Sequence, residues 1–263
     1  MTILESAGSV SVAYDVIDGP TPDAPVVLLS NSIGSTRSMW NRQTAALARH
    51  FRVVRYDTRG HGESPVPAGP YTIDQLADDA VGLLDRLGVR CAHVVGLSLG
   101  GMTAMSLAAR YPDRVDRLAL LCTSPAYDDE VAWRARAATV RSQGTSVIAA
   151  ATVGRWYTPA FLESEPERAA AAEAMISGIP AEGYAACCEA IATMDLRLLL
   201  PTITAATVCI AGADDPAAPP AVLEAIARAV PGARFTVIES AAHLANDEQP
   251  DAVVAALLAH LLG

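Results

Sequence analysis

Short runs of β-branched and aliphatic residues recur along the chain and alternate with segments of helical periodicity. A continuous apolar run such as 26–29 is typical of a parallel strand that is buried on both faces. The predicted strands span residues 10–17, 26–29, 52–56, 92–95, 117–121, 207–211 and 234–238. Helical patterns separate them, so the sequence predicts an α/β fold with a mostly parallel central sheet and helices on both faces.

The clearest predicted helix follows Thr72. Gln75 stands three residues later, which is the spacing of a capping box. Gly88 is expected to end this helix. Its apolar positions lie on one face of a helical wheel: Leu76, Ala80, Leu83, Leu84 and Leu87.

The alternation of strands and helices stops between about residues 124 and 200. That stretch is rich in alanine and charged residues, contains Trp133 and Trp156, and has no convincing strand. We interpret it as a helical cap inserted between two strands. The predicted division is a core made of residues 1–123 and 199–263, and a cap made of residues 124–198.

Composition narrows the class of protein. With 263 residues, 51% of them hydrophobic and 18% charged, the chain can bury a sizeable core. A formal net charge of −10 argues against nucleic acid or an anionic membrane as a partner. No apolar run can span a bilayer, no secretory signal is visible, and the five cysteines lack metal-ligand spacing. We expect a cytoplasmic protein with reduced thiols and no metal, and the sequence leaves a homo-oligomer open.

The strongest chemical motif is Gly96-Leu97-Ser98-Leu99-Gly100, which fits the G-x-S-x-G pattern. It follows a predicted strand and precedes a helical pattern, which is the context of a nucleophile elbow. Ser98 is therefore the predicted nucleophile, and the alternative is an ordinary Gly-Ser turn. The backbone N–H of Leu99 and one N–H from the loop at 30–34 are the candidate donors of an oxyanion hole.

A serine nucleophile needs a base, and the base needs an acid that orients it. His243 follows the strand at 234–238, and the other histidines fit the role less well, with His61 as the main rival. Asp214 and Asp215 both follow the strand at 207–211, so position alone does not decide which of them is the acid. The carboxyl ends of parallel strands meet at one edge, which is where ligands of open α/β sheets bind.

Taken together, these motifs resemble those of 3-oxoadipate enol-lactonases, members of the α/β-hydrolase superfamily that act in bacterial aromatic degradation. The similarity runs over nearly the whole chain. Two of its segments are the more specific, because they lie in the predicted oxyanion loop and in the cap. The segments that carry it are Ser30-Asn31-Ser32-Ile33-Gly34, Arg55-Tyr56-Asp57-Thr58-Arg59-Gly60-His61-Gly62, the serine motif with the following Gly101-Met102, Arg155-Trp156-Tyr157-Thr158-Pro159 and Gly183-Tyr184-Ala185-Ala186-Cys187-Cys188-Glu189-Ala190-Ile191.

The resemblance implies a helical cap, places the acid on Asp215 and places the second oxyanion donor on the N–H of Ile33. One departure is Leu99, where the family usually has methionine. This exchange conserves volume and keeps the backbone N–H.

The implied reaction is hydrolysis of an anionic enol-lactone to 3-oxoadipate, with no cofactor. The carboxylate of such a substrate needs a cation. Arg136 is the first candidate, with Trp133 and Trp156 as further pocket residues, and Arg141 and Arg155 are alternatives. A solvated arginine is the competing interpretation for each. A general carboxylesterase, a C–C bond hydrolase or a cofactor-free perhydrolase would keep the same triad, and so could a non-catalytic receptor.

Overall fold

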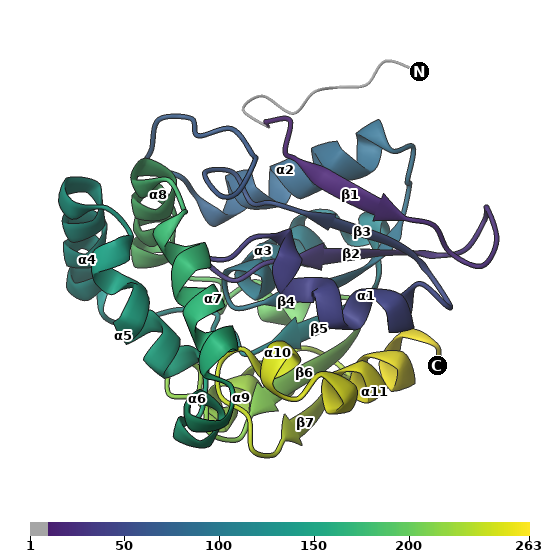
Figure 1. Ribbon diagram of the computed structural model, residues 1–263. Helices are drawn as coiled ribbons and strands as arrows, with labels where there is room; N and C mark the ends of the chain where they lie inside the picture. The colour runs from purple at the N-terminus through teal and green to yellow at the C-terminus, as the bar shows by residue number, and fades with distance from the viewer. Residues whose placement is uncertain (1–9) are drawn as a thin grey trace.

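The computed structural model describes residues 10–263, which form a seven-stranded sheet flanked by helices (Figure 1). The strands lie in the order β1-β3-β2-β4-β5-β6-β7, and all neighbours are parallel except β1, which pairs antiparallel with β3. The predicted fold class is confirmed. The strands are β1 (Tyr14–Ile17), β2 (Val26–Ser30), β3 (Arg52–Tyr56), β4 (Ala92–Leu97), β5 (Val115–Leu121), β6 (Ala206–Gly212) and β7 (Arg234–Ile238).

The prediction of a strand over 10–17 was wrong in its first half, because β1 begins only at Tyr14. The preceding backbone makes its hydrogen bonds elsewhere. The N–H of Val10 donates to Asp79 Oδ1 at 2.6 Å, and the N–H of Ala13 donates to Ser64 Oγ at 2.9 Å. Side-chain acceptors therefore take the N–H groups of Val10 and Ala13, whereas the carbonyl of Ala13 still accepts from the N–H of Asp57 at 2.9 Å. Hydrophobic alternation alone does not reveal such side-chain acceptors.

Helices cover both faces of the sheet, as predicted. Alternate strand residues point to opposite faces, so Leu28 and Val94 belong to one apolar cluster and Leu29 and Val95 to the other. The first cluster includes side chains of α2 (Ile73–Arg86), α3 (Leu99–Arg110) and α9 (Pro220–Ala229). The second includes side chains of α1 (Asn41–Leu47) and α11 (Pro250–Leu261). Shorter helical turns are η1 (Arg37–Trp40), η2 (Pro112–Arg114), η3 (Leu200–Thr202) and α10 (Ala245–Glu248).

Helix α2 has the predicted ends. Thr72 Oγ1 accepts from the N–H of Gln75, and Gln75 Oε1 accepts from the N–H of Thr72, both at 3.1 Å. Gly88 follows the last turn with φ +68°, a conformation that glycine adopts without strain. The capping box and the apolar face of this helix therefore follow directly from the local sequence.

Five helices fill the segment between β5 and β6 and lie at one end of the sheet (Figure 1). An isolated bridge between Ala126 and Asp195 joins the two ends of the segment, and the N–H of Leu196 donates to the carbonyl of Pro125 at 2.8 Å. The domain boundaries at 124 and 198 stay a prediction. The helices are α4 (Glu130–Gln143), α5 (Ser146–Trp156), α6 (Pro159–Ser164), α7 (Pro166–Ser177) and α8 (Ala181–Thr193).

Two further observations concern surfaces and thiols. None of the helices within residues 10–263 is long and apolar enough to cross a bilayer. All five cysteines are free thiols, and each is buried except the half-buried Cys91.

Candidate active site

Ser98 occupies a strained turn between β4 and α3. Its backbone has φ 56° and ψ −116°, a conformation that costs a non-glycine residue about 1–3 kcal/mol. The turn requires glycine at positions 96 and 100, because the backbone there passes too close to neighbouring backbone for a Cβ to fit. A Cβ on Gly96 would lie 2.2 Å from the carbonyl oxygen of Gly100, and a Cβ on Gly100 would lie 2.2 Å from that of Ser30. The motif thus forms the elbow that a serine nucleophile requires.

His243 and Asp215 meet at the carboxyl ends of β7 and β6. Nδ1 of His243 lies 2.8 Å from Asp215 Oδ2, and both side chains are buried. The other oxygen of Asp215 accepts from the N–H groups of Ala217 and Ala218 at 2.8 and 3.1 Å. Burial opposes ionisation of Asp215, but His243 and these N–H groups outweigh it and lower the pKa of the carboxyl. Asp215 is therefore held as a carboxylate that fixes the imidazole of His243.

Asp214 lies in different surroundings from Asp215. Its side chain is exposed, and its N–H donates to the carbonyl of Ala241 at 2.9 Å. The structure thus brings Asp215, and not its neighbour, to His243. The sequence left open which of the two aspartates contacts the histidine. The path of the chain in the turn after β6 decides this, because it buries Asp215 beside His243 and exposes Asp214.

The loop at 30–34 is fixed by the buried His61. The N–H of Gly34 donates to His61 Nε2 at 3.0 Å. Burial is the largest influence on His61 and lowers its pKa to about 4, so the ring is neutral near pH 7 and Nε2 can accept. Asn31 adds a second tether, because its amide donates to the carbonyl of Tyr56 at 2.6 Å. His61 therefore supports the loop that carries Ile33 and does not line the cavity beside Ser98.

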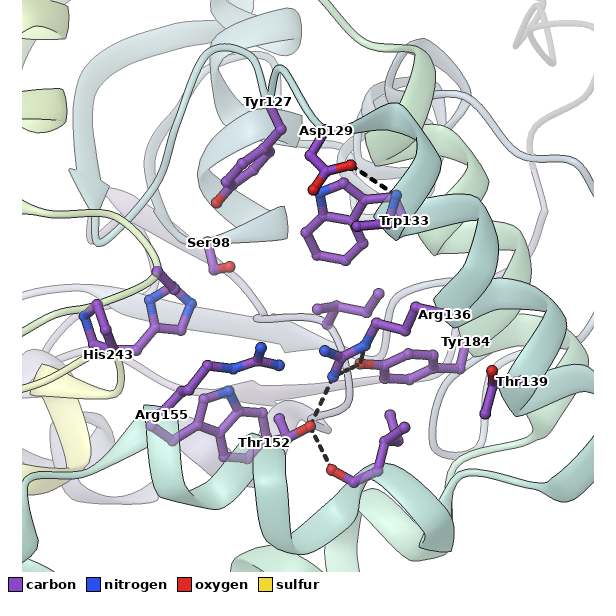
Figure 2. A pocket seen from close by; sticks show the side chains of 16 residues that line it. Ser98, Tyr127, Asp129, Trp133, Arg136, Thr139, Thr152, Arg155, Tyr184 and His243 are labelled. Carbon is purple, nitrogen blue, oxygen red and sulfur yellow. Dashed lines mark hydrogen bonds between the residues drawn. The ribbon is translucent and has the colours of Figure 1, made fainter.

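A cavity of about 500 Å³ lies between the sheet and the cap. Its walls come from the core and from α4, α5 and α8 (Figure 2). Leu99 is the first residue of α3, so its N–H has no acceptor within the helix. The residues lining the cavity include Ile33, Ser98, Tyr127, Trp133, Arg136, Thr152, Arg155, Trp156, Tyr184 and His243.

Arg136 is held in this cavity by neutral partners. Its Nε and Nη2 donate to the hydroxyl of Tyr184 at 2.9 and 2.6 Å, and Nη2 also donates to Thr152 Oγ1 at 2.7 Å. The guanidinium lies over the rings of Trp133 and Tyr184, at 5.9 and 5.5 Å from their centroids. Within residues 10–263 it forms no ion pair, so its positive charge stays available to a ligand.

The three candidate arginines differ in their ion pairs and in whether they line the cavity. Arg141 forms ion pairs with Glu182 and Glu189 at 2.7 and 2.8 Å and lines none of the cavity. Its place as an alternative was therefore wrong, because two carboxylates already neutralise it outside the site. Arg136 and Arg155 both line the cavity that contains Ser98.

Sequence reasoning missed three side chains that shape the site. Tyr184 and Thr152 position Arg136, and Tyr127 lines the cavity with its hydroxyl directed toward Ser98 (Figure 2). Tyr184 belongs to a cap segment that carried the family resemblance, which was the only signal in the sequence. Its contact with Arg136 spans 48 residues, and no local pattern predicts such a pairing.

Glu248 is a fourth missed residue and holds the loop that carries His243. Its Oε2 accepts from the N–H of Ala242 at 2.8 Å, and its Oε1 accepts from the N–H of Thr158 at 3.1 Å and from the hydroxyl of Thr158. A nearly buried carboxylate thereby joins the histidine loop to the start of α6. Leu244 adds a backbone bond to Trp156 at 2.9 Å. The cap and the histidine loop are thus fixed to each other.

Comparison with known proteins identifies the family that has this geometry. A family model described as the alpha/beta hydrolase fold matches residues 25–250. The chain belongs to the α/β hydrolase fold family. The prediction of a hydrolytic enzyme of this fold is thereby confirmed.

Three similar proteins of this family are lactonases or esterases. The 3-oxoadipate enol-lactonase 2 of Acinetobacter baylyi is 40% identical over 230 residues, which are 88% of this chain and 86% of that protein. The crystal structure of the enol-lactonase from Burkholderia xenovorans LB400 matches with a TM-score of 0.93 and 42% identity over 96% of both chains. A thermophilic esterase from Thermogutta terrifontis, described with malate bound, matches with a TM-score of 0.90 and 33% identity over 95% and 92% of the chains. The predicted resemblance to 3-oxoadipate enol-lactonases is confirmed.

Proposed function

We propose that this α/β hydrolase converts 3-oxoadipate enol-lactone into 3-oxoadipate, as a step of bacterial aromatic degradation. The observation that carries the proposal is Arg136. It is a positioned cation without an acidic partner in residues 10–263, and it lines the same cavity as Ser98 and His243. A cavity that combines a serine nucleophile with such a cation suits an ester that carries a carboxylate.

The reaction begins at the elbow. His243 takes the proton of Ser98 as Oγ attacks the lactone carbonyl, and Asp215 stabilises the imidazolium that forms. The hydrogen bond of 2.8 Å to Asp215 keeps the second ring nitrogen of His243 directed toward the cavity. The strained turn at Ser98 presents Oγ without rearrangement of the backbone.

The negative charge then develops on the carbonyl oxygen. The N–H of Leu99 and the N–H of Ile33 are the donors that we assign to this oxyanion. Helix α3 begins at Leu99, so its positive end adds to the stabilisation. His61, through its bond to Gly34, keeps the loop that carries Ile33 in place.

Collapse of the intermediate breaks the ring C–O bond and leaves an acyl group on Ser98. The leaving group is an enol, which takes its proton from His243 and becomes a ketone. Water activated by His243 then adds to the acyl carbon, and 3-oxoadipate leaves. Apart from the substrate and water, these steps use side chains and backbone groups of this chain.

The acetate carboxylate of the substrate would bind Arg136. A charge-assisted contact in a partly desolvated cavity contributes about 1.5–3 kcal/mol, which is one to two orders of magnitude in rate. Trp133 and Trp156 would cover the ring, since both line the cavity. A neutral analogue would leave the guanidinium without its ionic partner, which adds to the discrimination.

Turnover of the enol-lactone tests the proposal. We expect kcat/KM for the free carboxylate to exceed that for its methyl ester by about tenfold to a hundredfold. Arg136→Ala should remove this difference and leave hydrolysis of p-nitrophenyl acetate nearly unchanged. Arg134→Ala, on the same helix but exposed and paired with Glu130, is the matched control.

A general carboxylesterase is the second candidate, favoured by the similarity to the Thermogutta terrifontis esterase. The same assay separates the two. If the wild-type protein hydrolyses the methyl ester with the same kcat/KM as the free carboxylate, the enol-lactonase proposal fails and the general carboxylesterase takes its place.

A further inference from the structure

Two arginines face one cavity, although a single-carboxylate substrate needs only one of them. Arg155, on α5, lines the same space as Arg136, on α4. Figure 2 shows both guanidinium groups directed toward the middle of the cavity, with Arg155 on the side of His243. The site therefore holds two positive charges in a chain whose formal net charge is −10.

Neither charge is neutralised by an ion pair within the described part of the chain. Within residues 10–263, no acidic side chain forms an ion pair with Arg136 or Arg155. The carboxylate that lines the cavity belongs to Asp129, and its Oδ1 accepts from the N–H of Ala132 at 2.8 Å, as the N-cap of α4. In residues 10–263 no ion pair joins Asp129 to Arg136 or Arg155, and Asp129 is not among the groups that shift the pKa of Arg155.

The two arginines also repel each other. Burial is the main cause that lowers the pKa of Arg155, and the charge of Arg136 is the second. The two guanidinium groups, which line the same cavity, are therefore close enough for their charges to interact. Bringing two cations together in this way costs free energy, which an anionic ligand can recover.

The side chains differ in how firmly they are held. Arg136 has three hydrogen bonds to the hydroxyls of Tyr184 and Thr152. Arg155 makes none with another side chain or backbone group in the described part of the chain, so its donors are all free to bind a ligand. The fixed guanidinium of Arg136 suits a carboxylate that the ligand carries throughout the reaction. The unrestrained guanidinium of Arg155 suits a carboxylate that forms or moves during the reaction.

We propose that Arg155 binds a second carboxylate, so that the cavity is built for a dicarboxylate with one end on Arg136 and the other on Arg155. The inference rests on the proposed function only for the identity of that dicarboxylate. Lactone hydrolysis breaks the ring C–O bond, adds water across it and releases a proton from the new acid at neutral pH. The substrate thus carries one negative charge and the product two, and the new carboxylate arises at the carbon that was bonded to Ser98.

The location of the new carboxylate matches the location of Arg155. The acyl carbon lies at Ser98 and His243, and Arg155 is the arginine on that side of the cavity (Figure 2). The acetate end lies toward Arg136. The cavity consequently holds the product more tightly than a singly charged ligand of the same size, and product inhibition depends on Arg155.

Binding of a product-sized dicarboxylate tests this proposal without any turnover. Adipate and monomethyl adipate have nearly the same length, and they differ by one negative charge. Titration calorimetry would use the Ser98→Ala protein, since an active esterase could hydrolyse the monoester. We expect adipate to bind about tenfold more tightly, which corresponds to about 1.4 kcal/mol.

Variants assign that difference to Arg155. Adding Arg155→Gln should abolish the preference for adipate, whereas Arg155→Lys keeps the charge and should retain part of it. Arg136→Gln should weaken both ligands, and Arg134→Gln should change neither, because Arg134 is exposed and paired with Glu130. Thermal unfolding of each variant checks that the fold is kept.

The outcomes separate this inference from the proposed function. An unchanged preference for adipate in Arg155→Gln would overturn the inference, as would equal binding of the two ligands to the parent protein. If the preference depends on Arg155 but the wild-type enzyme does not hydrolyse the enol-lactone, the dicarboxylate site stands and the proposed substrate is wrong. Turnover of the enol-lactone without any preference for adipate supports the substrate and refutes the role of Arg155.

Discussion

Adjacent residues of one type can have very different environments, and Asp214 and Asp215 are an example. Asp215 is buried and accepts from His243 and two backbone N–H groups, whereas Asp214 is exposed. The turn after β6 therefore directs one carboxylate toward His243 and leaves the other in contact with solvent. A pair of conservative substitutions exploits this difference.

Asp215→Asn should lower kcat by about 10³- to 10⁴-fold, while Asp214→Asn should change it by less than about twofold. Asparagine at 215 can donate to His243 Nδ1, which favours the wrong imidazole tautomer, and it cannot stabilise the imidazolium. Steady-state hydrolysis of p-nitrophenyl acetate measures both variants on equal terms. Equal losses at the two positions would mean that the acid of the triad is placed wrongly.

The residues that the sequence could predict are those with a local signature. The serine motif combines glycine spacing with a strand and a helix on either side, and the turn at Ser98 follows from it. The choice between Arg136 and Arg155 had no such signature, because the direction of a side chain on a cap helix depends on partners such as Tyr184. Whether these residues have the assigned roles stays a prediction.

At the level of elements, the sequence predicted every strand of the described sheet, although the preceding residues 10–13 were wrongly included in the first strand. The fully buried strands β2 and β4 are apolar runs of the kind that parallel strands form, whereas the antiparallel edge strand β1 is only partly buried and was indicated by its β-branched residues. The same reasoning placed helices across 124–198 but did not predict how they pack. Packing against the histidine loop depends on contacts such as that between Glu248 and Thr158, which are 90 residues apart. Such contacts are set by the tertiary fold, and hydrophobic periodicity carries no information about them.

Glu248→Gln should loosen the connection between the histidine loop and α6. One carboxylate oxygen would become an amide NH₂, which would face the N–H of Ala242 or the N–H of Thr158, so a buried bond to a charged group would be lost. We expect kcat on p-nitrophenyl acetate to fall about tenfold and the free energy of unfolding to fall by about 2 kcal/mol.

The control for this prediction is Glu239→Gln, a change of the same kind at an exposed position after β7. It should alter neither quantity by more than experimental error. If Glu248→Gln destabilises the protein without any loss of kcat, the carboxylate supports the fold but does not position His243.

At the scale of the whole molecule, histidines that are buried in the neutral state make stability depend on pH. Burial is the first cause that lowers the pKa of His61 and of His260 to about 4. His260 lies at the far end of α11 from the active site, where Arg234 faces its Nδ1 at 3.1 Å and the carbonyl of Ala206 faces its Nε2 at 3.1 Å. Protonation of His260 would place a cation beside Arg234 and Arg117.

His260→Gln should flatten the dependence of stability on pH between about 6.5 and 4. In that interval the unfolded chain binds a proton that the folded His260 does not, so the free energy of unfolding rises with pH and falls on acidification. The full effect of one such histidine on the free energy of unfolding is about 3 kcal/mol, and it is lost when the imidazole is removed.

Urea unfolding of wild type, His260→Gln and the exposed-site control His50→Gln at pH 7, 6, 5 and 4.5 measures the slopes of the free energy of unfolding against pH. On acidification, the free energy of unfolding should fall with the same slope in the wild type and in His50→Gln. The slope for His260→Gln should be smaller by the contribution of one bound proton. Parallel curves for all three proteins would show that His260 has the same proton affinity in the folded and unfolded chains.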